Sequence, residues 1–150
     1  MITTSFRLRG SLAALALLAL AGCHDPTSVQ SSELAARRAR WVAHGLTSYE
    51  YDYMLTGFFI QFAGHRIHLV VRDGAVQTAT DLTTGQVLAV SPQRWPTIDD
   101  LFDDAQRAAD SGSLSRVLFD GTLDYPAEID IAGPPDASGA VFATGLAALP

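Results

Sequence analysis

The chain contains a single cysteine, Cys23, and no lysine among its 150 residues. One cysteine cannot form an internal disulfide or a zinc site built from several thiolates, so packing must stabilise the fold. The absence of lysine excludes the Ser-x-x-Lys motif of one class of serine-dependent enzymes. The Gly-x-Ser-x-Gly motif of another class is also missing.

Positive charge is scarce as well, and its distribution is uneven. The ten basic residues are all arginines, and Arg7 and Arg9 lie in an N-terminal segment that has no acid. From residue 23 onward, eight arginines face all 16 carboxylates, which gives a net charge of −8. Binding to nucleic acid needs a basic patch that neutralises phosphates. The composition therefore argues against nucleic acid as a partner, and we expect none.

The first 22 residues have the composition of an export signal. Two arginines precede an apolar stretch over residues 12–21, which is too short to span a bilayer. The stretch ends in "LAGC", which resembles the bacterial lipobox: a branched apolar residue, two small residues and the cysteine that receives a diacylglyceryl group. We expect cleavage before Cys23 and lipidation of its thiol. An ordinary signal peptide with a free cysteine and an uncleaved anchor are the alternatives.

The lipobox resemblance implies a location and a membrane contact. Two or three acyl chains on Cys23 anchor a protein stably, because each buried methylene contributes about 0.8 kcal/mol. His24, and not an aspartate, follows the cysteine, and by resemblance to Gram-negative sorting signals this permits passage to the outer membrane. The expected location is the bacterial cell envelope, lipid-anchored in the outer membrane and facing the periplasm.

The remaining chain has the length of one domain. We expect residues 1–22 to form the lipoprotein signal peptide and the polar residues 23–32 to form a flexible lipidated tether. Residues 33–150 are then a single domain. The sequence contains no internal repeat, no low-complexity block and no sign of a second domain.

Two helices and a sheet are expected in this domain. Ser32 can cap a helix that ends near Gly45, and Thr97 can cap a second helix that ends at Gly112. Alternation in "YEYDYML" and "HRIHLVV" and an Asp-Gly turn at 73–74 indicate antiparallel strands. The prediction is an α+β fold with an antiparallel sheet of about five strands and two helices packed on one face.

Histidines and acidic residues give no clear catalytic or metal site. His65 and His68 lie three residues apart on a predicted strand and so point to opposite faces, which favours ordinary surface or core histidines over a metal site. A calcium site needs oxygens that converge from a loop, whereas four aspartates radiate from the second helix: Asp99, Asp100, Asp103 and Asp104. We predict no catalytic residue, no metal and no cofactor.

Two groups of side chains between residues 37 and 59, one of arginines and one of aromatic residues, each allow a structural and a functional interpretation. Three arginines at positions 37, 38 and 40 are interpreted as a solvated helix face, with an anion site as the alternative. An aromatic group is either the floor on which the helices pack or a patch that grips a sugar ring or a peptide. The candidate binding patch consists of Trp41, Tyr49, Tyr51, Tyr53, Phe58 and Phe59.

Several motifs together carry a family resemblance. Trp41 precedes the tyrosine strand, and "VVRDGAV", "TIDDLFDDAQRA" and "VLFD…DYPAEIDI" follow in order. From about Trp41 to Ile131 the chain resembles the DUF6174 family, a group of small bacterial lipoproteins of unknown function. Members often carry a Cys-x-Cys after the tyrosine strand, where this chain has "GFF", so no disulfide or metal role for those cysteines transfers. The resemblance implies location and fold class, and no activity.

These observations lead to one functional prediction and one alternative. The tether, the missing catalytic motifs and the aromatic excess predict a membrane-anchored, non-catalytic envelope lipoprotein that binds a protein or cell-wall component. The alternative is a module that binds a small ligand in an aromatic pocket between helix and sheet. An enzyme is the least favoured hypothesis.

Overall fold

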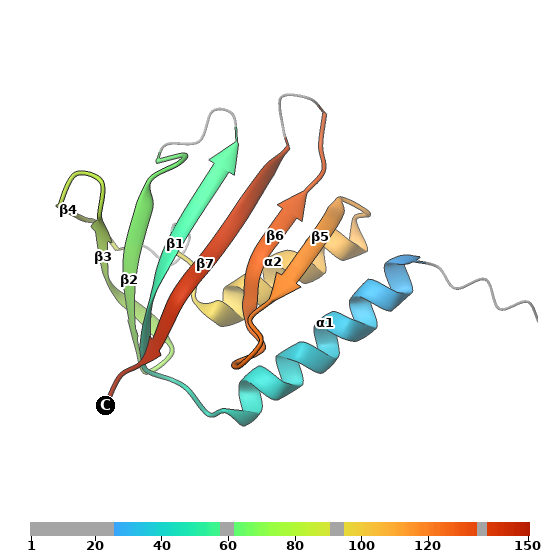
Figure 1. Ribbon diagram of the computed structural model, residues 1–150, viewed down its shortest axis with the longest axis horizontal. Helices are drawn as coiled ribbons and strands as arrows, with labels where there is room; N and C mark the ends of the chain where they lie inside the picture. The colour runs from blue at the N-terminus through green and yellow to red at the C-terminus, as the bar shows by residue number, and fades with distance from the viewer. Residues whose placement is uncertain (1–25, 58–61, 91–94, 135–137) are drawn as a thin grey trace, which may run out of the picture.

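The computed structural model describes residues 26–57, 62–90, 95–134 and 138–150. These residues form two helices and seven strands (Figure 1), which are α1 (Pro26–Ala43), β1 (Tyr49–Gly57), β2 (Arg66–Arg72), β3 (Ala75–Asp81), β4 (Gln86–Leu88), α2 (Ile98–Asp110), β5 (Leu114–Phe119), β6 (Pro126–Ile131) and β7 (Gly139–Ala148). All seven strands belong to one antiparallel sheet in the order β4-β3-β2-β1-β7-β6-β5. The predicted α+β class is confirmed.

The predicted number of about five strands is wrong, because the sheet has seven. The difference lies in strands with weak sequence signals at the two edges of the sheet. β4 has only three residues, and the burial of side chains along β5 does not alternate strictly. Such strands are specified by backbone pairing with a neighbour, which a period-2 hydrophobic pattern does not report.

The first and last strands of the chain are neighbours at the centre of the sheet. β1 pairs with β7 from Tyr49, opposite Ala148, to Gly57, opposite Gly139. The two backbones approach so closely at Gly139 that a Cβ atom there would lie 2.5 Å from the carbonyl oxygen of Thr56. The pairing of β1 with β7 therefore joins strands β1 to β4 and strands β5 to β7 into a single sheet.

Helix α1 begins at Pro26, six residues before the expected cap at Ser32. Proline fits the first turn of a helix for two reasons. An N–H group at this position would have no partner within the helix, so its absence costs nothing, and the φ angle of proline is already helical. No glycine or further proline follows before Ser32 to end the helix. Residues 26–32 are therefore helical, and the predicted flexible tether is wrong over this range. The predicted signal peptide and residues 23–25 lie outside the described residues.

Helix α2 begins as its sequence predicts. The Thr97 N–H donates to Asp100 Oδ2 at 2.8 Å, and the Asp100 N–H donates to Thr97 Oγ1 at 3.2 Å, which completes a capping box. Its apolar stripe is buried, and Gly112 follows the helix with a φ of 72°. The positive φ favours glycine at this position.

Both helices contribute to one core on one side of the sheet (Figure 1). Leu34 and Trp41 of α1 and Leu101 of α2 are buried in this core. On the other side of the sheet, side chains such as Glu50 and Asp52 are only half-buried. None of the described helices is long and apolar enough to cross a membrane.

Candidate functional site

The aromatic residues predicted as a binding patch lie mainly in the core. Trp41 is 2 % exposed, Tyr49 1 % and Tyr51 0 %, and Tyr53 is also buried. As a surface patch the prediction is wrong for these four residues, and the alternative that they form the floor beneath the helices is correct. Phe58 and Phe59 lie outside the described residues.

The physical reason is that α1 and α2 both dock on the tyrosine row of β1. The Trp41 ring meets the Tyr49 ring edge-on, with 5.5 Å between centroids. The Ile98 N–H donates to Tyr49 Oη at 2.9 Å, and the Tyr51 hydroxyl donates to the Pro96 carbonyl oxygen. The phenolic oxygens therefore fix the start of α2 and do not face a ligand.

Burial keeps these phenols neutral. It raises the pKa of Tyr49 to about 12, although the hydrogen bond from the Ile98 amide opposes the shift. Burial also raises the pKa of Tyr51 well above its ordinary value. Both hydroxyls therefore stay protonated near neutral pH, and both are used in hydrogen bonds within the core.

The two histidines lie on opposite sides of the sheet, and each is next to a carboxylate. His65 Nδ1 lies 2.7 Å from Asp81 Oδ2 on the helix side, and His68 Nδ1 lies 2.9 Å from Asp52 Oδ1 on the open side. Neither histidine lines the two hollows described below. Within the described residues, no three histidine, cysteine or acidic side chains converge on a point where they could hold a metal.

Asp81 is the most deeply buried carboxylate among the described residues, at 1 % exposure. Burial alone raises the pKa of a carboxyl group. Here the hydrogen bond with His65, the Thr83 N–H at 2.8 Å and the Thr84 hydroxyl outweigh burial and lower the pKa of Asp81 to about 2. The ionised carboxylate thus secures the turn between β3 and β4.

The arginines of α1 were interpreted from the sequence as a solvated helix face, and their side chains are partly exposed, but each also forms an ion pair with another part of the domain. Arg38 Nη1 lies 2.5 Å from Asp103 Oδ1 of α2, and Arg37 Nη1 lies 2.7 Å from Asp124 Oδ1 before β6. Arg40 Nε also binds Asp124, at 3.0 Å. These ion pairs hold α1 against α2 and the β5–β6 connection, a role that depends on which elements are neighbours.

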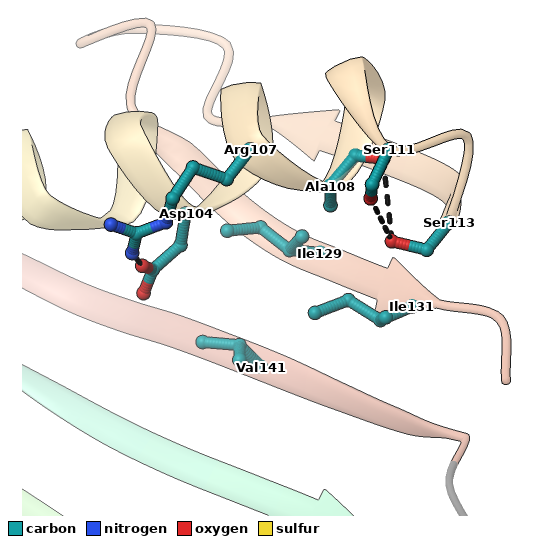
Figure 2. Close-up of a pocket in the computed structure, with 8 residues that line it drawn as sticks. All are labelled: Asp104, Arg107, Ala108, Ser111, Ser113, Ile129, Ile131 and Val141. Atoms are coloured by element: carbon teal, nitrogen blue, oxygen red, sulfur yellow. Dashed lines mark hydrogen bonds and ion pairs between the residues drawn. The ribbon is translucent and has the colours of Figure 1, made fainter.

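A cleft with a mixed polar and apolar lining lies between α2 and the strands β6 and β7 (Figure 2). Ile129 and Ile131 of β6 and Val141 of β7 form its apolar floor, and Ala108 of α2 faces them. Its volume is about 290 Å³. We call this hollow the α2 cleft.

Polar groups line the rim of the α2 cleft at two places. The Arg107 guanidinium binds the Asp104 carboxylate at one end (Figure 2). At the other end, Ser111 Oγ and Ser113 Oγ lie 2.8 Å apart. A group that enters the cleft would therefore meet branched aliphatic side chains below and a charged pair and hydroxyls at the entrance.

The sequence analysis did not single out this cleft. Asp104, Arg107, Ala108 and Ser111 follow the i, i+3, i+4, i+7 spacing of one side of a helix, but nothing in that spacing indicates a hollow. The one sequence feature that could have indicated the cleft is the three alanines on the buried side of α2, because their small side chains leave space between the helix and the sheet. These are Ala105, Ala108 and Ala109.

A second hollow, of about 370 Å³, lies at the start of α2. Trp95, Val76 and Val90 give it apolar walls, and Asp99 and Asp100 give it an acidic rim. The Asp100 carboxylate is already engaged by the helix cap. Trp95 is 3 % exposed, and its indole N–H donates to the Ala89 carbonyl oxygen at 2.9 Å. We call this hollow the Trp95 hollow.

Comparison with known proteins gives a family and no activity. A family model described as a family of unknown function, DUF6174, matches residues 33–142. No curated protein and no solved structure matches the chain. The matched residues run from α1 into β7 and include both helices' contacts with the sheet. The chain therefore belongs to the DUF6174 family of unknown function.

Proposed function

We propose that the protein is a lipid-anchored protein of the bacterial envelope that binds, without catalysis, an aliphatic group of a protein or cell-wall partner in the α2 cleft. The anchor would be Cys23, at the end of the lipobox-like "LAGC" segment, and the location would be the periplasmic side of the outer membrane. The observation that supports binding is the apolar floor of the cleft inside a polar rim.

The size of the α2 cleft limits what it can take. Pockets that enclose a drug-sized ligand have volumes of about 300–1,000 Å³, whereas this cleft measures about 290 Å³ and is open to solvent. It fits one aliphatic side chain or a short aliphatic group better than a large cofactor. Such a site suits a partner that presents one apolar anchor.

A photo-crosslinking amino acid in place of Arg107, at the rim, tests this proposal in intact cells. We expect a discrete adduct with one envelope component, identified by mass spectrometry. The same amino acid in place of Gln77, an exposed residue of β3, is the matched control. We expect Ile131→Asp, which places a charge in the apolar floor, to abolish the adduct. No adduct from position 107, or one that survives Ile131→Asp, would contradict the proposal.

The Trp95 hollow supports a second candidate, a small-ligand site between helix and sheet. Its indole ring and two valines form an apolar wall of the kind that encloses small molecules. Ligand binding there should change the emission of Trp95, and Trp41→Phe would remove the other indole from the signal. Emission that is unchanged across a broad ligand screen would count against this candidate.

A further inference from the structure

We propose that the α2 cleft takes a lysine side chain of a basic partner protein, with the aliphatic stem on the apolar floor and the ammonium group beside Ser111 and Ser113. The inference rests on the binding function proposed for the cleft. It adds to that function the chemical class of the bound group, its direction in the cleft and the charge of the partner.

The first argument is that the two serines at one end of the cleft have no hydroxyl proton to offer a ligand. The Ala108 carbonyl oxygen accepts from the Ser113 N–H at 2.9 Å, and it lies 3.1 Å from Ser111 Oγ and 3.3 Å from Ser113 Oγ. The two hydroxyl oxygens lie 2.8 Å apart. One hydroxyl therefore donates to Ala108, and the other donates to the first hydroxyl. Because each hydroxyl has a single proton, only acceptor lone pairs remain for a ligand.

The second argument is the electrostatic environment of these hydroxyls. They lie where α2 ends, and the C-terminus of a helix carries a partial negative charge that favours a cation. Among the described residues that line the cleft, Arg107 alone carries a positive charge. Figure 2 shows its side chain pointing away from the serines, toward Asp104. A cationic group at the serine end therefore meets hydrogen-bond acceptors and no repelling charge.

The third argument is the apolar floor between the two ends. Ile129, Ile131 and Val141 line it with branched aliphatic side chains. From Asp104 to Ser111, α2 rises about 10 Å, so the cleft suits an extended chain of methylene groups. Lysine combines a flexible aliphatic stem with a terminal ammonium that only donates hydrogen bonds. A carboxylate on the same stem would face lone pairs at the serine end and be repelled.

The other end of the cleft offers donors. The Arg107 guanidinium binds Asp104 through Nη2, and a guanidinium has five N–H donors in all. Its remaining donors suit the main-chain carbonyl oxygen of the bound lysine. The two ends of the cleft therefore differ in hydrogen-bonding character, and this difference sets the direction in which the lysine lies.

The sequence shows that the lysine must come from a different protein. The chain contains no lysine, so neither another segment of it nor a second copy can supply this side chain. From residue 23 onward the chain carries a net charge of −8, which attracts a basic partner and speeds its association. A basic protein that presents a lysine fits both the cleft and the charge of the whole domain.

Three short peptides test the proposal on the full chain in detergent micelles. One is acetyl-Ala-Lys-Ala-amide, the second replaces lysine with norleucine, which keeps an aliphatic stem without the ammonium, and the third replaces it with glutamate. Binding is followed by NMR of the isoleucine methyl groups. We expect the lysine peptide to shift the signals of Ile129 and Ile131 and to leave those of Ile67 and Ile98, which are buried and do not line the cleft, unchanged. We expect the norleucine peptide to bind about tenfold more weakly, because it lacks the hydrogen bonds of a charged group, and the glutamate peptide not to bind.

Two variants locate the ammonium group. Ser111→Ala combined with Ser113→Ala removes the acceptors, and we expect the lysine and norleucine peptides to bind this variant equally. Ser115→Ala, which removes an exposed hydroxyl of β5 outside the cleft, is the matched control and should keep the preference for lysine. Ser113→Ala alone replaces the double variant if that variant misfolds.

The outcomes separate this inference from the proposed function. Equal binding of the lysine and norleucine peptides to the wild-type chain would overturn the lysine assignment and leave the binding of an aliphatic group in place. A preference for lysine that survives the loss of both serines, or tighter binding of the glutamate peptide, would also overturn it. If no peptide shifts the signals of Ile129 and Ile131, the lysine assignment is wrong. The absence of a crosslink from position 107 would then show that the proposed function is wrong as well.

Discussion

The two sides of the sheet carry similar chemical groups in different surroundings. Beneath the helices, the hydroxyls of Tyr49 and Tyr51 and the carboxylate of Asp81 are buried, and each has a hydrogen-bond partner. On the open side, Arg116 and Asp130 form an ion pair with half-exposed side chains. Water screens the pairs on the open side, whereas a polar group under the helices has no alternative partner. We therefore expect changes under the helices to affect stability more.

The largest expected effect comes from removing an aromatic ring under the helices. We expect Trp41→Ala to lower the free energy of unfolding by about 3–5 kcal/mol, because the substitution leaves a cavity between α1 and the Tyr49 ring. Phe142→Ala, which removes a half-buried ring from the open side, should cost clearly less. Urea denaturation measures both. If both substitutions lower the free energy of unfolding equally, side chains under the helices do not contribute more to stability than those on the open side.

A smaller effect is expected from one buried hydroxyl. Tyr51→Phe leaves the Pro96 carbonyl oxygen without its donor, and we expect a loss of about 1–3 kcal/mol. Tyr53→Phe is the matched control, since the Tyr53 hydroxyl has no hydrogen-bond partner among the described residues and its ring packs on Trp95. A loss at Tyr53 as large as that at Tyr51 would contradict the role of the Pro96 contact.

The smallest effect that we predict concerns acid stability. The pKa of Asp81 is about 2 in the folded protein and 3.8 ordinarily. The ionised carboxylate therefore stabilises the fold above about pH 4, and this contribution is lost as the pH falls toward 2. We expect the difference in unfolding free energy between the wild-type chain and Asp81→Asn to shrink over this range. If the difference in unfolding free energy between the two chains does not change with pH, the lowered pKa of Asp81 is contradicted. If Asp81→Asn does not fold, His65→Gln provides the same comparison.

The second helix shows how far sequence patterns reach. The cap at Thr97, the two acids of the first turn, the apolar stripe and Gly112 are all local signals within about sixteen residues, and each appears in the structure. The first helix shows their limit. Its true start at Pro26 lies in a short polar run, and this composition favoured a tether although proline suits the first turn of a helix.

The α2 cleft could not be predicted in the same way. Its floor comes from β6 and β7, and its other wall comes from α2, which precedes both strands in the chain. A hollow is the space that packed side chains leave, and no local pattern encodes that space. The arginines of α1 illustrate the same point, because their partners Asp103 and Asp124 are distant in sequence.

The sequence by itself determined the family resemblance, the α+β class, the second helix and the expectation of a lipid at Cys23, because these depend on short runs of residues and on composition. The tertiary structure decided that the aromatic row is a core, that β1 and β7 meet at the centre, and where the cleft lies. Those features depend on which segments become neighbours, and the burial of apolar surface across the whole domain decides this.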